Sequence, residues 1–163
     1  MTVEASPTIG QFDADRAPAF ARYLAAGGGR PGIVGIVEHG DERGRELGFP
    51  TANLAIDDTV ARDGVWAANV ILESGQSYAA AVSIGRRTTF YGRQGVRLLE
   101  AHLLGFSGDL YGRQIRVDLW HLIRLQRRFT DAGALVEQIA LDVADARAWA
   151  VKHGVTGSIA TSA

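Results

Sequence analysis

A chain of 163 residues with 47% hydrophobic and 21% charged residues suits one globular domain that buries a real core. Its net charge of −1 argues against a broad nucleic-acid interface, and the absence of cysteine excludes disulfides and thiolate metal sites. No apolar run approaches the ~18–20 residues that span a membrane, and the first residues lack the pattern of a secretory signal. We therefore expect a cytoplasmic protein without nucleic-acid or membrane partners, and we take a monomer as the expected state.

The first part of the chain predicts a loose lead-in over residues 1–31. Within it, the apolar spacing favours a short helix from Asp13 to Ala26, and the glycine-rich run at residues 27–31 ends that helix. We expect the main domain to occupy residues 32–153 and a flexible tail to follow over residues 154–163.

Beyond residue 31 the pattern changes from helix to strand. Short β-branched segments bounded by glycine and other turn residues predict five strands: Gly32–Glu38, Gly64–Leu72, Ser77–Ile84, Val96–Leu104 and Gln114–Ile123. Residues 73–76 (ESGQ) predict a hairpin turn between the second and third of them, and FSGDLYG predicts a turn that pairs the last two. The alternation of apolar and polar residues in the last strand indicates a sheet with one buried face.

The last element is expected to be a helix capped by Thr130 and Asp131 and ended by Gly154. Apolar residues recur along it at three- and four-residue spacing: Leu135, Ile139, Val143, Ala146 and Trp149. Closely spaced strands followed by one amphipathic helix predict a mainly β fold, a small antiparallel barrel with the helix packed outside.

The loop of residues 39–54, HGDERGRELGFPTANL, carries the first chemical signal. Glycines let the backbone approach a ligand, arginines can bind phosphate, and a proline stiffens the exit: Gly40, Gly44, Gly48, Arg43, Arg45 and Pro50. Thr51 and Asn53 present a hydroxyl and an amide oxygen on one face of an extended segment, and both oxygens suit Mg²⁺. The same composition is also typical of a surface loop with solvated arginines. The GxxxxGK[ST] spacing of a P-loop is absent.

Glu100, in VRLLEAHLLGF, is the second signal. A carboxylate between apolar neighbours costs several kcal/mol to bury unless it is paired or used, which makes Glu100 a candidate general base. Alternatively, this face of the strand is solvated while Leu99 and Leu103 face the core. His102, two residues on, can pair with Glu100, act as a second acid or have a structural role.

The third signal is the segment IRLQRRF at residues 123–129. Arginines beside an aromatic residue can hold a flat heteroaromatic ring through stacking and cation–π contact. Such a run also occurs as a solvated approach to a helix, and the residues alone leave both interpretations open.

In their order, these segments resemble the riboflavin kinases. PTAN after LGF, then GVW, SIG, LEAHLLGFSGDLYG and IR…RF before an amphipathic helix extend the resemblance from about Gly32 to Trp149. The resemblance, which includes the kinase domain of bacterial bifunctional FAD synthetases, implies a six-stranded Greek-key barrel with an outer C-terminal helix. It also implies a phosphotransferase that converts ATP and riboflavin into ADP and FMN, with Mg²⁺ as cofactor.

The resemblance further implies roles for individual residues. Glu100 matches the catalytic base, while Thr51 and Asn53 match metal ligands. The implied nucleotide-binding residues are Gly40, Arg43, Arg45, Gly48, Pro50 and Thr51, in a loop that acts as a flap. The implied flavin-binding residues are Arg124, Arg127 and Phe129.

Two departures from the family pattern keep alternatives open. Thr88 stands where bacterial members usually have proline, and Gln126 stands where many have glutamate, which removes a charge partner for nearby arginines. One alternative is a kinase-like paralogue that phosphorylates a different flavin or polyol. Another is a non-catalytic flavin- or nucleotide-binding regulatory module, which would have no need of a base. A chain of this length lacks room for the adenylyltransferase domain of many bacterial members, so we expect a standalone kinase.

Overall fold

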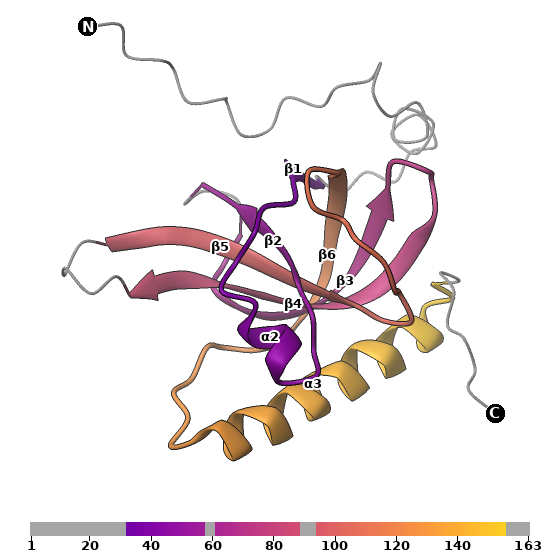
Figure 1. Ribbon diagram of the computed structural model, residues 1–163. Helices are drawn as coiled ribbons and strands as arrows, with labels where there is room; N and C mark the ends of the chain where they lie inside the picture. The colour runs from indigo at the N-terminus through magenta and orange to yellow at the C-terminus, as the bar shows by residue number, and fades with distance from the viewer. Residues whose placement is uncertain (1–31, 58–60, 89–93, 156–163) are drawn as a thin grey trace, which may run out of the picture.

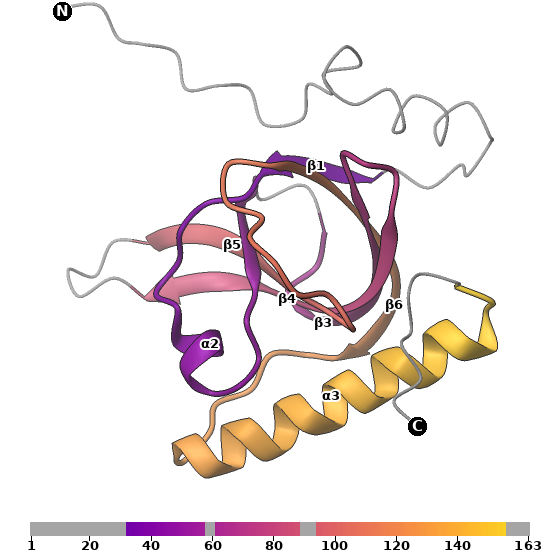
Figure 2. The same ribbon diagram turned by 45° about the vertical axis from the view of Figure 1, so that its right-hand side comes forward.

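The computed structural model describes residues 32–57, 61–88 and 94–155. These residues form six β-strands and two helices: β1 (Ile33–Ile36), α2 (Arg43–Glu46), β2 (Ala52–Ala55), β3 (Gly64–Leu72), β4 (Ser77–Thr88), β5 (Gln94–Leu103), β6 (Gln114–Arg124) and α3 (Ala132–Lys152). The strands are antiparallel and make one sheet in the order β1-β6-β3-β4-β5-β2, which curves into a nearly closed barrel (Figures 1 and 2). The predicted mainly β fold is confirmed.

The strand order contains the expected Greek key. Strands β3, β4 and β5 follow one another as neighbours, and β6 returns to lie beside β3. The two edge strands come together at an isolated bridge between Glu38 and Asn53, where the Glu38 N–H donates to the Asn53 carbonyl at 2.9 Å. This bridge is the seam of the barrel.

The predicted pairing of the last two strands is wrong. Strand β5 pairs with β4 and β2, whereas β6 pairs with β3 and β1. The connection over residues 104–113 is longer than the two to five residues typical of hairpin loops. It binds the end of β1 instead, since Val37 exchanges backbone hydrogen bonds with Gly112 and Arg113, each 2.9 Å long. The connection thus carries the chain to another part of the sheet.

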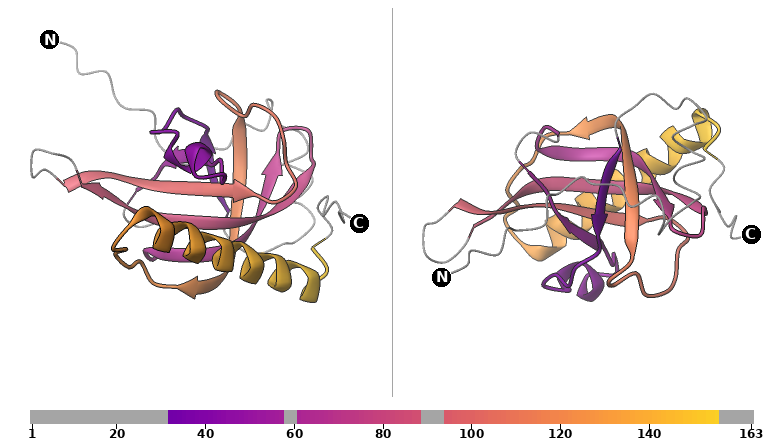
Figure 3. Two further views of the ribbon diagram at one scale, coloured as in Figure 1. Left: turned by 60° about the horizontal axis from the view of Figure 1, so that its bottom comes forward. Right: turned by 90° about the horizontal axis from the view of Figure 1, so that it is seen from above.

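The remaining predicted strands are present with small changes of length. Strand β3 has the predicted limits, and the turn at residues 73–76 forms with Gly75 at φ 86°. Strand β4 continues beyond its predicted end, and together with β5 it projects past the barrel as a long ribbon (Figure 3). Strand β2 and the short helix α2 were not among the predicted elements.

The barrel interior is apolar. Its fully buried side chains include Val70, Ala80, Val82, Ile84, Leu99, Ala101, Ile115 and Val117. Because Leu99 and Leu103 belong to this core, the opposite face of β5, which carries Glu100, points out of the barrel.

Helix α3 lies across the outer face of β3 and β4 (Figure 2). The Asp131 carboxylate caps it by accepting the Ala134 N–H at 2.8 Å, and Gly154, at φ 66°, follows its end as predicted. Small side chains at the contact, Ala67, Ala81 and Ala146, let the helix approach the sheet closely. This contact positions the helix beside the face that carries Glu100.

Several expectations fall outside the described residues. These are the helix from Asp13 to Ala26, the tail beyond residue 155 and the side chain of Thr88. Among the helices that are described, none has the length and apolar character needed to cross a membrane.

Candidate functional site

Two adjoining cavities lie around the ends of β2 and β5. The first cavity, about 430 Å³, lies between the outer face of β3–β5, the turn at α2, the segment after β6 and helix α3. The second cavity, about 640 Å³, lies between the loop of residues 39–50 and the loop of residues 106–111. Both cavities are lined by Glu42, Thr51 and Asn53. These three residues therefore form the junction between the two cavities.

Asn53, Glu100 and Ser83 form a row across three neighbouring strands. Glu100 on β5 has Asn53 of β2 as its register partner on one side and Ser83 of β4 on the other. Side chains of register partners share one face of a sheet, with Cβ atoms about 4.5–5.5 Å apart. The row lines the first cavity, and Glu100 is half-buried there. The sequence left open whether Glu100 is buried in the core or lies on a solvated face. The structure shows neither, because the face that carries Glu100 lines a cavity outside the core.

Thr51 extends the row toward the second cavity. Its hydroxyl donates to Asn53 Oδ1 at 3.0 Å, so the two oxygens stay together on the outer face of β2. The described residues contain no cluster of three or more His, Asp or Glu side chains that could hold a metal. The neutral oxygens of Thr51 and Asn53 fit a hard cation that takes its other ligands from water and phosphate.

The loop of residues 39–50 folds back on itself just before Thr51. Helix α2 is a single turn preceded by Glu42 in a left-handed conformation, at φ 55°. The Phe49 N–H donates to the Gly44 carbonyl at 2.7 Å, and a Cβ on Gly44 would lie 2.5 Å from the Phe49 oxygen. Only glycine fits at position 44 without a shift of the backbone.

The predicted nucleotide-binding residues divide between the two cavities. Gly40, Arg45 and Pro50 line the second cavity, whereas Arg43 lines the first. Gly48, at φ 88°, lines neither of them and serves the turn after α2.

His102 contacts this loop from β5. Its Nδ1 lies 2.8 Å from the Pro50 carbonyl oxygen, and the Phe49 ring meets the imidazole edge-on at 5.5 Å between centroids. These contacts favour the structural interpretation of His102 over a role as a second acid.

Arg124 lines the first cavity, but its guanidinium is already engaged. It makes a two-pronged ion pair with Asp142 of α3, Nε to Oδ1 at 2.8 Å and Nη2 to Oδ2 at 2.7 Å, and Nη1 donates to the Leu125 carbonyl. Asp142 is buried and also accepts a bond from Gln138 at 3.0 Å. The pair joins the end of β6 to the helix that closes the cavity.

Sequence reasoning missed this ion pair. The available signal was Asp142 itself, an acidic residue within the apolar stripe of α3, three positions after Ile139 and four before Ala146. A buried carboxylate on such a stripe requires a partner. The pattern could not name the partner, because Arg124 lies on a different element.

Phe129 and Arg127 complete this side of the cavity in unequal ways. Phe129 is half-buried and lines the first cavity, whereas Arg127 is exposed and does not line it. The Cζ atom of Arg127 lies 5.1 Å from the Phe129 ring centroid, and that of Arg124 lies 5.7 Å from it. The two arginines thus flank the ring that faces the cavity.

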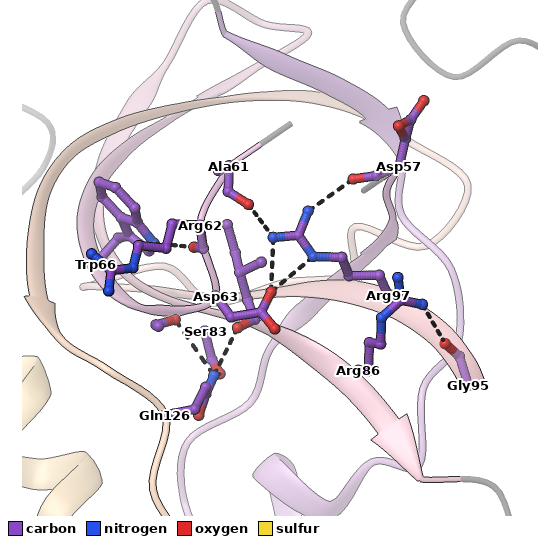
Figure 4. A network of polar contacts seen from close by, with 12 residues as sticks. Asp57, Ala61, Arg62, Asp63, Trp66, Ser83, Arg86, Gly95, Arg97 and Gln126 are labelled. Atoms are coloured by element: carbon purple, nitrogen blue, oxygen red, sulfur yellow. Dashed lines mark hydrogen bonds and ion pairs between the residues drawn. The ribbon is translucent and has the colours of Figure 1, made fainter. Parts of the chain in front are cut away.

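Gln126 acts as a hydrogen-bond donor to the sheet (Figure 4). Its Nε2 lies 2.9 Å from both Ser83 Oγ and the Ile84 carbonyl oxygen, and 3.4 Å from the Gly64 carbonyl oxygen. A glutamate could not donate to these carbonyls in its ionised form. The role of Gln126 here is therefore to attach the segment after β6 to β3 and β4.

A second polar network holds the connection between β2 and β3 (Figure 4). The buried Arg97 of β5 donates to the Asp63 carboxylate at 2.8 Å and to the Asp57 carbonyl at 2.9 Å, and it also contacts the Ala61 carbonyl. This network holds the ends of the connection between β2 and β3 against β5.

Comparisons with known proteins agree with this architecture. The flavokinase (riboflavin kinase) family model matches residues 28–150. A bifunctional riboflavin kinase/FMN adenylyltransferase of Haemophilus influenzae is 39% identical over 118 residues, covering 72% of this chain and 38% of the relative. The chain spans less than half the length of this relative and of similar ones from Bacillus subtilis and Pseudomonas fluorescens.

Two solved structures share this fold over most of the chain. The crystal structure of a riboflavin kinase from Trypanosoma brucei matches with a TM-score of 0.54 and 27% identity, covering 77% of this chain and 83% of that one. A Streptococcus pneumoniae protein described as a macrolide-efflux protein matches with a TM-score of 0.66 and 35% identity, over 75% of this chain and 40% of that one. Since the family model covers most of the chain and includes the whole barrel, this protein belongs to the riboflavin kinase family.

Proposed function

We propose that this protein transfers the γ-phosphoryl group of ATP to the 5′-hydroxyl of the ribityl chain of riboflavin, giving FMN and ADP. One observation carries the proposal: Thr51 and Asn53 line both cavities, and Asn53 is the register partner of Glu100. A phosphate donor in the second cavity and an acceptor in the first would meet at this row. Membership of the riboflavin kinase family supports the same reaction.

The character of each cavity supports this division of substrates. Arg45 and Gly40 line the second cavity, and they offer a guanidinium and an open backbone to phosphate oxygens. In the first cavity, Phe129 and apolar residues of α3, Leu135 and Ile139, offer a surface for the flat isoalloxazine ring. The ribityl chain would then extend toward Glu100.

Glu100 is the proposed general base. It takes the proton from the 5′-hydroxyl as that oxygen bonds to the γ-phosphorus, and the bond from this phosphorus to the bridging oxygen breaks so that ADP leaves. Most of the catalytic effect comes from alignment of the two substrates, because phosphoryl transfer needs little covalent help from a protein.

Riboflavin kinases use ATP with a divalent metal, and we propose Mg²⁺ for this chain. Thr51 Oγ1 and Asn53 Oδ1 would hold it, since they form a pair of hard oxygen ligands next to the row. When bound, Mg²⁺ neutralises charge on the phosphates during transfer. The loop of residues 39–50 would act as a flap that excludes water from the γ-phosphate.

A direct assay tests the proposal. The purified protein is incubated with riboflavin, ATP and MgCl₂, and the products are separated by chromatography, with FMN and ADP expected in equal amounts. Tight riboflavin binding without FMN would favour a binding module. Turnover only with another polyol or flavin would favour a paralogue with a different acceptor.

The proposal also includes the setting in which the protein works. We propose a cytoplasmic monomer that acts on small molecules, without nucleic-acid or membrane partners. Light scattering at working concentration tests the monomer, and cell fractionation tests the location.

A further inference from the structure

The ladder between β2 and β5 ends just before Thr51, one of the two residues proposed to hold the metal and the nucleotide. Its last pair in this direction is Ala52 with Ala101, so Thr51 lies beyond the regular hydrogen bonds of the ladder. Pro50, one residue earlier, has no N–H to donate. A backbone with so few bonds would leave Thr51 free to change its orientation.

His102 supplies a bond at the point where the ladder stops. It follows Ala101 on β5, and its Nδ1 lies 2.8 Å from the Pro50 carbonyl oxygen. A carbonyl oxygen can only accept, so Nδ1 carries the proton of this bond. The side chain thereby replaces the backbone bond that a longer ladder would have made.

The same imidazole also holds the loop through its ring. Phe49 packs edge-on against it, and the Phe49 N–H binds the Gly44 carbonyl at 2.7 Å. A continuous series of contacts thus runs from β5 through His102 to Phe49 and the turn at α2. Phe49, Thr51 and His102 all line the first cavity.

We propose that His102 is a positioning residue that attaches the loop of residues 39–50 to β5 and so holds Thr51 and Asn53 ready for the nucleotide. This proposal rests on the proposed function, because it assumes that these two residues serve a metal–nucleotide complex. Without the bond, part of the free energy of nucleotide binding is used to order the loop, and the measured affinity for the nucleotide is lower. Glu100 keeps its place, since its ladder with Ser83 of β4 does not involve the loop.

Three substitutions at His102 separate this role from simple packing. His102→Leu fills space but cannot donate, His102→Asn keeps a donor near the position of Nδ1, and His102→Gln moves the donor to the position of Nε2. His121→Leu is the matched control, because His121 is exposed and lines neither cavity.

Two readouts are independent of catalysis: the dissociation constant of Mg-ADP by calorimetry without riboflavin, and amide hydrogen exchange over residues 51–54. We expect His102→Leu and His102→Gln to raise the dissociation constant and the KM for ATP about tenfold, the usual worth of one hydrogen bond. Exchange over residues 51–54 should quicken, and the KM for riboflavin should change less than the KM for ATP, although His102 also lines the first cavity. His102→Asn should recover most of the loss, and His121→Leu should match the unmodified protein.

The outcomes distinguish the two proposals. If the unmodified protein binds Mg-ADP but makes no FMN, the proposed function fails, and the binding data still decide the role of His102. Unchanged Mg-ADP affinity and unchanged exchange in His102→Leu would overturn that role. An equal loss of kcat in the Leu and Asn variants at constant affinity would also overturn it, because that is the pattern of a purely structural residue. If His102→Leu does not fold, the Mg-ADP affinities of His102→Asn and His102→Gln are compared instead. Equal affinities in these two variants would overturn the role of His102. Absence of Mg-ADP binding by the unmodified protein would reject both proposals.

Discussion

The two cavities differ in how their walls are held. The first cavity is bounded by strands β3–β5 and helix α3 on most sides, with the turn at α2 and the segment after β6 on the others. Side chains tie these walls together, since Arg124 joins β6 to Asp142 of α3 and Gln126 attaches the following segment to β4. The second cavity is enclosed mainly by two loops, with contacts such as the stack of His39 on Tyr111 at 3.7 Å between ring centroids. Under the proposed assignment of substrates, the acceptor would enter the cavity with tied walls and the nucleotide would enter the cavity enclosed by loops.

Such a division suits a kinase that must exclude water. A fixed acceptor site sets the line of attack before the nucleotide arrives, whereas a loop site can close over the phosphates afterwards. Substitutions confined to one cavity test whether the two cavities can be disturbed separately.

The largest effect is expected at Glu100, which lines the first cavity and is the register partner of Asn53 at the junction. Replacing Glu100 with glutamine removes the proposed base while it keeps the size of the side chain, so kcat should fall ~10²–10⁴-fold. Binding of riboflavin and of Mg-ADP should stay close to that of the unmodified protein. Steady-state kinetics and calorimetry measure these quantities, and circular dichroism checks the fold. A folded Glu100→Gln protein with normal turnover would refute the mechanism.

The next largest effect is expected at the ion pair between Arg124 and Asp142, which ties two walls of the first cavity together. Asp142→Leu leaves the Arg124 guanidinium without its carboxylate, and breaking a largely buried pair costs about 3 kcal/mol of the free energy of unfolding. Urea denaturation measures the loss, and the KM for riboflavin should rise more than the KM for ATP. Gln138→Leu is a milder control that removes one bond to Asp142, worth about 1 kcal/mol. Equal effects on both KM values would contradict the separate construction of the cavities.

Substitution of two neighbouring arginines, Arg43 and Arg45, tests the loop that encloses the second cavity. Arg45 lines the second cavity and Arg43 lines the first, although both lie on the same helical turn. Arg45→Ala should raise the KM for ATP about tenfold by loss of a charge-assisted bond, with the KM for riboflavin unchanged. Arg43→Ala should leave the KM for ATP within about twofold. Similar results for the two variants would mean that the cavities do not correspond to separate substrates.

The smallest effect is expected at Arg127. Its guanidinium lies over the Phe129 ring but is exposed and lines neither cavity. Cation–π contacts at exposed sites contribute about 0.5–1 kcal/mol, so Arg127→Ala should change the KM for riboflavin by less than about fivefold. Phe129→Leu provides the contrast, and it should have the larger effect on riboflavin. The opposite order would show that Arg127 contacts the flavin directly.

Much of this architecture could be predicted from the sequence, for physical reasons that differ between elements. Strand β3 is bounded by turn residues and rich in β-branched and small side chains, so its limits follow from local pattern alone. Strand β2 has four residues and is recognisable mainly by its pairing with β5, which no local pattern reveals. The pairing of β5 with β6 was wrong for the same reason, because strand partners depend on how the chain closes.

The site divides in a similar way. Thr51 and Asn53 are close in sequence, and the pairing of β2 with β5 brings them beside Glu100. The order of the motifs suggested that these residues meet, but their spacing in the sequence does not determine which residues pair. The resemblance implied that Arg124 contacts a flavin, and the structure adds that its Nε and Nη2 atoms bind Asp142, a partner on another element that no local pattern reveals. Helix α2 begins after a left-handed Glu42, a conformation that sequence pattern rarely indicates for glutamate.

The backbone and the side chain of Asn53 have different roles, and together they link ligand binding to the stability of the barrel. Its backbone makes the bridge to Glu38, while its side chain faces both cavities. A ligand bound at this side chain opposes opening of the seam, and at a concentration one hundred times its Kd it adds about 2.7 kcal/mol to the free energy of unfolding. The melting temperature should therefore rise with nucleotide concentration, and the slowing of hydrogen exchange should be concentrated along β1 and β2.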